Sequence, residues 1–131
     1  MRTLASVFKA LSDETRLQML GLLLKEGELC VCDFVAVLGV SQSKASRHLR
    51  HLVHAGLLQD RREAIWVHFR ITENPGILQQ GVLAGLRGFL PVQVPTELLK
   101  ALKTWRKSKT RGAKDCRPPI ARVSGSQRGR R

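Results

Sequence analysis

A three-residue break, Gly39-Val40-Ser41, separates two stretches of the chain whose apolar residues recur at helical spacing. The shorter stretch covers about residues 30–38, and the longer one covers about residues 42–54 and ends at Ala55-Gly56. Glycine favours a tight turn, and serine is a preferred residue at the start of a helix. A short helix, a glycine-containing turn and a second helix form the helix-turn-helix pattern, whose second helix normally enters the DNA major groove.

The hydrophobic pattern changes from helical spacing to alternation after Gly56, which predicts a β-hairpin. The first predicted strand covers residues 57–61, the second covers residues 65–71, and the turn between them is Arg62-Glu63-Ala64. One face of the second strand carries the apolar residues Ile65, Val67, Phe69 and Ile71. A hairpin directly after a helix-turn-helix is a wing, so the predicted fold is mainly α with a small β-hairpin wing, the winged helix-turn-helix.

Helical spacing also predicts helices over residues 3–11 and 13–25 before this unit, and over residues 77–90 and 96–107 after it. The prolines of Asn74-Pro75-Gly76 and at positions 91 and 95 are predicted breaks. The predicted organisation is therefore a DNA-binding and dimerisation domain over residues 1–90, a C-terminal helix within residues 91–107, and a basic disordered tail over residues 108–131.

Positive charge is concentrated at the C-terminal end of the chain. Residues 1–99 contain 11 Lys+Arg and 9 Asp+Glu, whereas residues 100–131 contain 12 Lys+Arg and a single acid, Asp115. Such a tail either attracts nucleic acid without reading its sequence or only keeps the protein in solution. No apolar run approaches the roughly 20 residues of a membrane span, and the N-terminus is too charged for a signal peptide, so we expect no membrane partner and a cytoplasmic location.

The longer helix of the pair carries the candidate DNA contacts. Gln42 can pair with adenine and Arg47 with guanine, whereas Lys44 and Arg50 are better placed to hold phosphates. The wing arginines, Arg61 and Arg62, are expected to reach the DNA backbone or minor groove. The full predicted set is Ser41, Gln42, Ser43, Lys44, Ser46, Arg47, His48, Arg50, Arg61 and Arg62. The alternative reading of this helix is a solvated basic face, and His48 packs or caps as readily as it touches DNA.

Cys30 and Cys32 lie at the start of the shorter helix, and an odd total of three cysteines in a reducing compartment favours free thiols over structural disulfides. Thiolates prefer soft, thiophilic ions. Residues i and i+2 of a regular helix point about 200° apart. The Cys30 and Cys32 sulfurs can therefore bind one ion only where the start of the helix is unwound. Cys116, in the tail, is either a third ligand or an incidental free thiol.

The segments ELCVCD at residues 28–33, SQSKASRHL at 41–49, DR at 60–61 and WVHFR at 66–70 resemble the arsenic-responsive repressors of the ArsR/SmtB family. The resemblance implies a homodimeric repressor that binds double-stranded operator DNA, an inverted repeat, and releases it when As(III) or Sb(III) binds Cys30 and Cys32. It implies a dimer interface of apolar residues from the first and last helices of the domain. These residues, which could instead belong to the chain's own core, are Leu4, Phe8, Leu11, Ile77, Leu78, Val82 and Leu86.

The chain departs from the family pattern at Val35, where some members have a third cysteine, and at Ala64, where the wing turn usually has glycine. Residues 77–90 contain no Asp, His, Glu or Cys, so the zinc site of some relatives is not expected, and no permanent cofactor is predicted. Two alternatives remain, a thiol redox-sensing regulator and a non-specific nucleic-acid-binding protein. An enzyme is not expected, because the chain has no CxxC motif, phosphate loop or Ser/His/Asp set.

Overall fold

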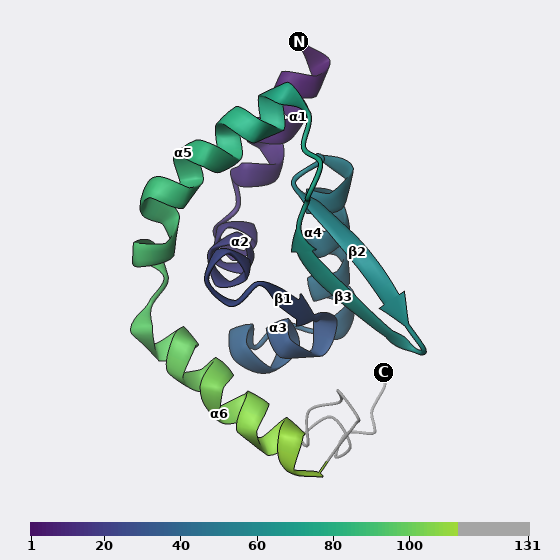
Figure 1. Ribbon diagram of the computed structural model, residues 1–131, viewed down its shortest axis with the longest axis vertical. Helices are drawn as coiled ribbons and strands as arrows, with labels where there is room; N and C mark the ends of the chain where they lie inside the picture. The colour runs from purple at the N-terminus through teal and green to yellow at the C-terminus, as the bar shows by residue number, and fades with distance from the viewer. Residues whose placement is uncertain (113–131) are drawn as a thin grey trace.

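The computed structural model describes residues 1–112, with side chains described to residue 109, as six helices and three short strands (Figure 1). Cys116 and most of the basic tail lie outside the described residues. The elements follow one another as α1 (Arg2–Leu11), α2 (Glu14–Glu26), β1 (Glu28–Cys30), α3 (Val31–Leu38), α4 (Gln42–His54), β2 (Leu58–Glu63), β3 (Trp66–Ile71), α5 (Ile77–Gln93) and α6 (Thr96–Gly112).

The helix boundaries follow from their capping residues, as the sequence predicts. The Asp13 side chain accepts a hydrogen bond from the Arg16 backbone N–H at the start of α2, and Ser41 accepts one from Lys44 at the start of α4, each at 3.1 Å. Gly39 adopts the left-handed conformation that ends α3. The turn between α3 and α4 is therefore set by two residues, Gly39, which ends α3, and Ser41, which caps α4.

The hairpin extends into a three-stranded antiparallel sheet with the order β1-β3-β2. Its turn is Ala64-Ile65 rather than the predicted Arg62-Glu63-Ala64, because Glu63 pairs with Trp66 and leaves only two residues to reverse the chain. Two-residue hairpin turns require a positive φ, and Ala64 supplies it at 57°. Ile65 is consequently exposed in the turn and does not share the apolar face of β3, which is a second correction.

The predicted break at Pro91 is wrong, because α5 continues through this proline to Gln93. A proline inside a helix costs roughly 3 kcal/mol. Leu90 and Val94, on either side of Pro91, are buried against α2 and lie over Gly21. Burial of two such side chains contributes roughly 1.5–3 kcal/mol each, which offsets the cost of the proline.

The two C-terminal helices run as one arc along the outside of the molecule in Figure 1, with α5 packed on α2 and α6 packed on α3. Helix α6 continues to Gly112, the last described residue, whereas the sequence predicts its end near Lys107 and the tail from residue 108. Among the described residues, each helix is too short or too polar to span a bilayer. The arc brings α6 to the start of α3, where the two cysteines lie.

Candidate thiol site and nucleic-acid interface

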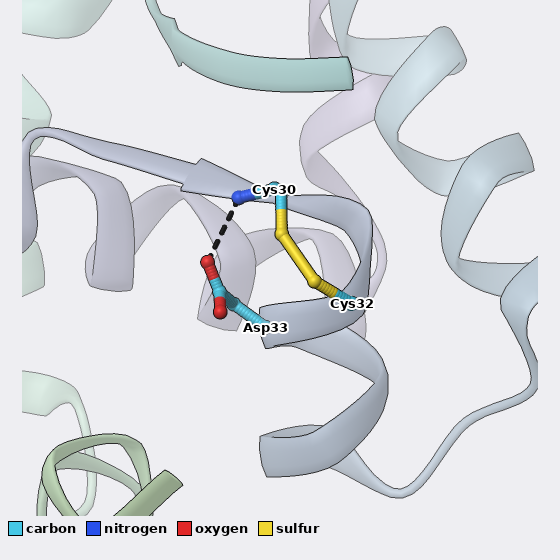
Figure 2. Close-up of side chains that lie close together, drawn as sticks. All are labelled: Cys30, Cys32 and Asp33. Atoms are coloured by element: carbon cyan, nitrogen blue, oxygen red, sulfur yellow. Dashed lines mark hydrogen bonds between the residues drawn. A yellow bond between two sulfur atoms is a disulfide. The ribbon is translucent and has the colours of Figure 1, made fainter. Parts of the chain in front are cut away.

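Cys30 and Cys32 meet at a junction between a strand and a helix. Cys30 is the last residue of β1 and the N-cap of α3, and its backbone is extended, with φ −96° and ψ 169°. Only Cys32 is helical, so the two side chains point toward each other although they are two residues apart, and their Cα atoms are 5.4 Å apart (Figure 2). The end of the strand thus provides the irregular helix start that two neighbouring thiols need.

The structure joins Cys30 and Cys32 by a disulfide, whereas the sequence predicts free thiols. The physical reason is proximity, since the strand–helix junction holds the two sulfurs against each other. Thiols held this way interconvert with the disulfide by a two-electron exchange with a thiol reductant or oxidant. Cys30 is 2% exposed and Cys32 is 9% exposed, so the disulfide is almost completely shielded from solvent.

Asp33 connects the cysteine pair to its surroundings. Its Oδ2 atom accepts a hydrogen bond from the Cys30 backbone N–H at 2.9 Å, and the Cys30 sulfur accepts the Asp33 N–H in return, a capping box at the start of α3. The sulfurs of Cys30 and Cys32 and a carboxylate oxygen of Asp33 lie within 4.8 Å of one another. Among the described residues, these three side chains form a cluster able to ligate an ion.

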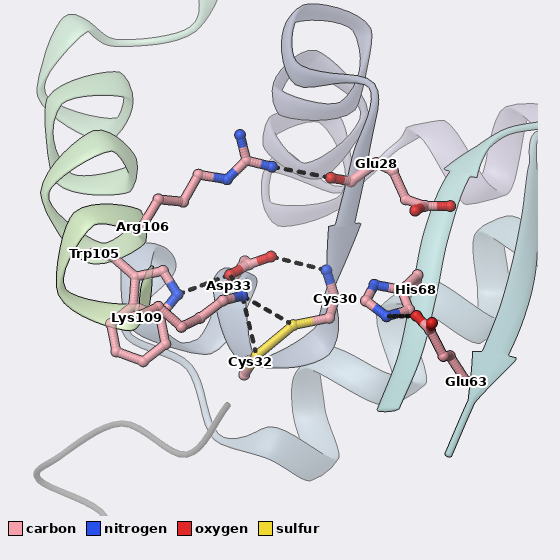
Figure 3. The surroundings of a disulfide bond; sticks show 9 residues. All are labelled: Glu28, Cys30, Cys32, Asp33, Glu63, His68, Trp105, Arg106 and Lys109. Atoms are coloured by element: carbon pink, nitrogen blue, oxygen red, sulfur yellow. Dashed lines mark hydrogen bonds and ion pairs between the residues drawn. A yellow bond between two sulfur atoms is a disulfide. The ribbon is translucent and has the colours of Figure 1, made fainter. Parts of the chain in front are cut away.

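Helix α6 covers this cluster with residues that are absent from the predicted site (Figure 3). Trp105 Nε1 donates a hydrogen bond to Asp33 Oδ1 at 2.7 Å, and Lys109 Nζ lies 2.7 Å from the same oxygen. The indoles of Trp66 and Trp105 pack against the cysteine pair. The only hint in the sequence is that Trp105 and Lys109 are four residues apart and therefore share one face of a helix.

The predicted DNA-contacting residues of α4 lie mostly on its outward face. Ser41, Gln42, Ser43, Lys44 and Arg47 are exposed and Ser46 is half-buried, while Ala45, Leu49 and Leu52 point into the core. Arg62 is exposed on β2. These seven polar residues are available to a ligand approaching α4 and the wing.

The other three predicted contacts are engaged within the fold. Arg50 pairs with Asp60 at 2.6 Å, and its guanidinium lies over the Phe69 ring. His48 Nδ1 lies 3.0 Å from Arg16 Nη1, a hydrogen bond that requires Nδ1 to be the acceptor, and burial lowers the pKa of His48.

Arg61 lies within β2 rather than at the tip of the wing. Its guanidinium donates to Glu28 at 2.7 Å and to Glu63 at 3.2 Å. The hydrogen bond from Arg61 lowers the pKa of the Glu28 carboxyl, with partial burial acting in the opposite direction. Because Glu28 starts β1, this ion pair ties the wing to the strand that ends at Cys30.

The predicted interface residues of α1 and α5 divide into exposed and buried members. Phe8 is 56% exposed and Ile77 is 90% exposed. Leu86, in contrast, is buried in the chain's own core, and Leu83 beside it is buried as well. The remaining predicted residues, Leu4, Leu11, Leu78 and Val82, are half-buried. A mainly apolar strip over α1 and α5 is thus only partly covered within one chain.

The fold and the exposed face of α4 define a winged helix-turn-helix regulator of transcription. Residues 13–60 match the family described as "Bacterial regulatory protein, arsR family". The chain is 34% identical over 73 residues to the "Arsenical resistance operon repressor" of Bacillus subtilis, covering 70% of that protein. The chain belongs to the arsR family of bacterial regulatory proteins, which are DNA-binding transcription factors and not enzymes.

Two other relatives are more similar over shorter segments. The "Arsenic resistance transcriptional regulator ArsR1" of Pseudomonas putida is 52% identical over 65 residues, and the "Arsenical resistance operon repressor" of Escherichia coli is 53% identical over 66. The matches span only 51% and 56% of those two relatives. Among solved structures, HlyU from Vibrio cholerae has a TM-score of 0.54 and 31% identity, and the match covers 67% of this chain and 92% of HlyU.

Proposed function

We propose that this protein is a homodimeric transcriptional repressor that releases its operator when As(III) or Sb(III) binds Cys30 and Cys32. The observation that carries the proposal is the position of the buried sulfur pair, at the start of the first helix of the helix-turn-helix. The names of the relatives from Pseudomonas putida, Escherichia coli and Bacillus subtilis support arsenic as the inducer. A repressor of this kind works in the cytoplasm, where DNA is found and thiols are kept reduced.

In this proposal α4 enters the major groove and its N-terminal half reads bases. Gln42 and Arg47 are exposed. Gln42 has both a donor and an acceptor for adenine, Arg47 donates to the acceptors of guanine, and Lys44 holds a phosphate. Arg62 on the wing reaches the DNA backbone or the minor groove. Ser41, Ser43 and Ser46 are small enough to let α4 approach closely, whereas Arg50, Arg61 and His48 contribute by positioning α4 and the wing.

A second copy completes the repressor, because two helices α4 are needed to read the two halves of an inverted repeat. The partly covered strip of α1 and α5 is the proposed dimer interface, with Phe8 and Ile77 as its most exposed members. Leu4, Leu11, Leu78 and Val82 flank them, and Leu86 supports the strip from the core side.

The sulfurs are suited to the inducer and are connected to the DNA-reading helix. Reduction of the disulfide by a thiol reductant opens two soft ligands. Both Asp33 oxygens already accept hydrogen bonds, so we assign the third ligand to a small external group or to Cys116. Because α3 packs on α4 and Cys30 pairs with His68 of the wing, a change at the sulfurs shifts both DNA-contacting elements. A shift lowers DNA affinity only if the inducer binds the DNA-free state more tightly.

The test measures the fluorescence anisotropy of labelled DNA from upstream of the gene as the reduced protein, residues 1–131, is added. The titration is done in the presence and in the absence of arsenite. We expect sequence-specific binding that is lost on adding arsenite. The double variant Cys30→Ser/Cys32→Ser should bind the same DNA and ignore arsenite. Cys116→Ser distinguishes the two assignments of the third ligand, because its arsenite response stays unchanged only if a small external group supplies that ligand. Release of DNA from the double variant on adding arsenite would refute the proposal.

The disulfide supports a second candidate, a redox-sensing regulator in which oxidation itself causes release. This candidate predicts that mild peroxide removes two hydrogen atoms from the protein mass and lowers DNA affinity, with no response of the reduced protein to arsenite. The arsenite titration above therefore distinguishes the two. A non-specific nucleic-acid-binding protein would lose nearly all affinity when the basic tail, residues 108–131, is deleted, whereas a repressor keeps its sequence preference.

A further inference from the structure

We propose that Lys109 is a specificity-determining residue of the thiol site, which favours the uncharged hydroxide of a trivalent metalloid over divalent cations. The proposal rests on the function proposed above, namely that Cys30 and Cys32 bind a thiophilic ion. It assigns a role to α6, a helix that lies outside the family match at residues 13–60.

The Lys109 ammonium is held directly against the ligand atoms. Its Nζ lies 3.7 Å from the Cys30 sulfur, 4.0 Å from the Cys32 sulfur and 2.7 Å from Asp33 Oδ1. The Trp105 ring lies beside it, with its centroid 6.0 Å from Nζ. Figure 3 shows the Lys109 side chain reaching from α6 between Asp33 and the disulfide, so a positive charge lies at the ligand cluster.

Without that charge, the cluster has the composition of a divalent cation site. Two thiolates and a carboxylate are ligands that zinc-group ions accept, and the three ligand atoms lie within 4.8 Å of one another. Lys109 opposes such an ion in two ways. Its ion pair offsets the negative charge of Asp33, and its own positive charge repels a cation, strongly so between charges about 4 Å apart in a poorly solvated site.

Arsenite near neutral pH is the uncharged species As(OH)₃, so Lys109 does not repel it on approach. Its binding to two thiols breaks two As–O and two S–H bonds, forms two As–S and two O–H bonds, and releases two water molecules. Arsenic stays trivalent and no electrons are transferred. This reaction needs the two sulfurs but not the Asp33 carboxylate, and Lys109 therefore discriminates against the cation without blocking the metalloid.

The experiment compares the affinities of the reduced full-length protein for arsenite and for Cd²⁺, each followed by the ultraviolet absorbance of sulfur-to-ion charge transfer. We expect Lys109→Gln to raise Cd²⁺ affinity about tenfold or more, since one nearby charge is removed, and to change arsenite affinity far less. Adding Asp33→Asn to Lys109→Gln should remove much of that gain. Lys109→Arg should keep the selectivity of the wild type.

The matched control is Lys107→Gln, which removes the same charge from an exposed position of the same helix and should leave both affinities unchanged. An unchanged ratio of the two affinities in Lys109→Gln, with both ions still bound, would overturn the role of Lys109 and leave the proposed function intact. Failure of the wild type to bind either ion would instead overturn the proposed function. Because Lys109→Arg keeps the charge, a ratio that changes equally in Lys109→Arg and Lys109→Gln would also overturn the proposal, as it would trace the effect to altered packing of α6.

Discussion

The helix-turn-helix and α6 both contribute to the thiol site, but they are attached to the protein in different ways. Helices α3 and α4 bury Phe34, Leu49 and Leu52 completely in the central core. Helix α6 buries Leu102, and its other apolar residues are half-buried or exposed. Leu98, Leu99 and Trp105 pack against the core from its edge. Polar contacts add to this attachment, through Trp105 and Lys109 to Asp33 and through Arg106 to Glu26 and the Glu28 carbonyl.

This difference indicates that the two regions contribute differently to the stability of the fold and to the chemistry of the thiol site. A helix with several fully buried side chains unfolds only with the whole domain, whereas a helix with one fully buried leucine and otherwise partly buried contacts opens locally more easily. Helix α6 can therefore cover and modify the thiol site while burying fewer side chains in the core than α3 and α4 do. The winged helix-turn-helix contributes more of the fully buried core than α6 does. Helix α6 places charged and polar groups next to the thiol site.

The largest effect is expected from truncation of a core leucine. Leu49→Ala should lower the free energy of unfolding by about 2–5 kcal/mol, because it leaves a cavity in a fully buried position. Leu102→Ala on α6 should cost less, because α6 can detach while the rest stays folded. Urea unfolding followed by circular dichroism measures both, and equal losses in one cooperative transition would contradict the division between the two regions.

A smaller effect is expected at Asp33, where the two regions meet. Asp33→Ala should cost about 1–3 kcal/mol, because the buried Cys30 N–H and the Trp105 indole N–H lose their acceptor. The tryptophan fluorescence, to which Trp66 and Trp105 both contribute, should shift at the same time if α6 opens. Asp60→Ala, which removes a half-exposed ion pair with Arg50, is the control and should cost about 1 kcal/mol or less. Equal losses of unfolding free energy in Asp33→Ala and Asp60→Ala would contradict the prediction that Asp33 connects the helix-turn-helix to α6.

The smallest effect is expected from titration of His48 on α4. Burial lowers its pKa below the ordinary 6.5, against the attraction of Asp13 and together with repulsion by Arg16. Because the folded state binds this proton less tightly, the stabilising contribution is complete above the unfolded-state pKa and is lost as pH falls through the lower folded-state pKa. Proton NMR of the imidazole should give a midpoint below 6.5. His48→Gln should reduce the fall in the free energy of unfolding at low pH. The tryptophan fluorescence is followed in the same experiment to show whether α6 also changes.

Local chemistry accounts for most of what the sequence predicts correctly. The caps Asp13 and Ser41 and the left-handed Gly39 act within a few residues, and α4 begins at Gln42 and ends at His54 as the pattern indicates. The resemblance carried by residues 28–33 and 41–49 is confirmed by the family match. The errors at the wing turn and at Pro91 both arise where pairing or burial with a distant segment overrides a local preference.

The sequence by itself determined the helix-turn-helix, the wing and the adjacent pair of cysteines, because each depends on residues close together in the chain. Only the tertiary structure decided what surrounds those cysteines. Strand β1 is three residues long and exists because β3 pairs with it, and this pairing turns Cys30 toward Cys32. Lys109 reaches the same sulfurs across 79 positions of sequence. Contacts of that separation depend on how α5 and α6 pack around the core, which no local pattern records.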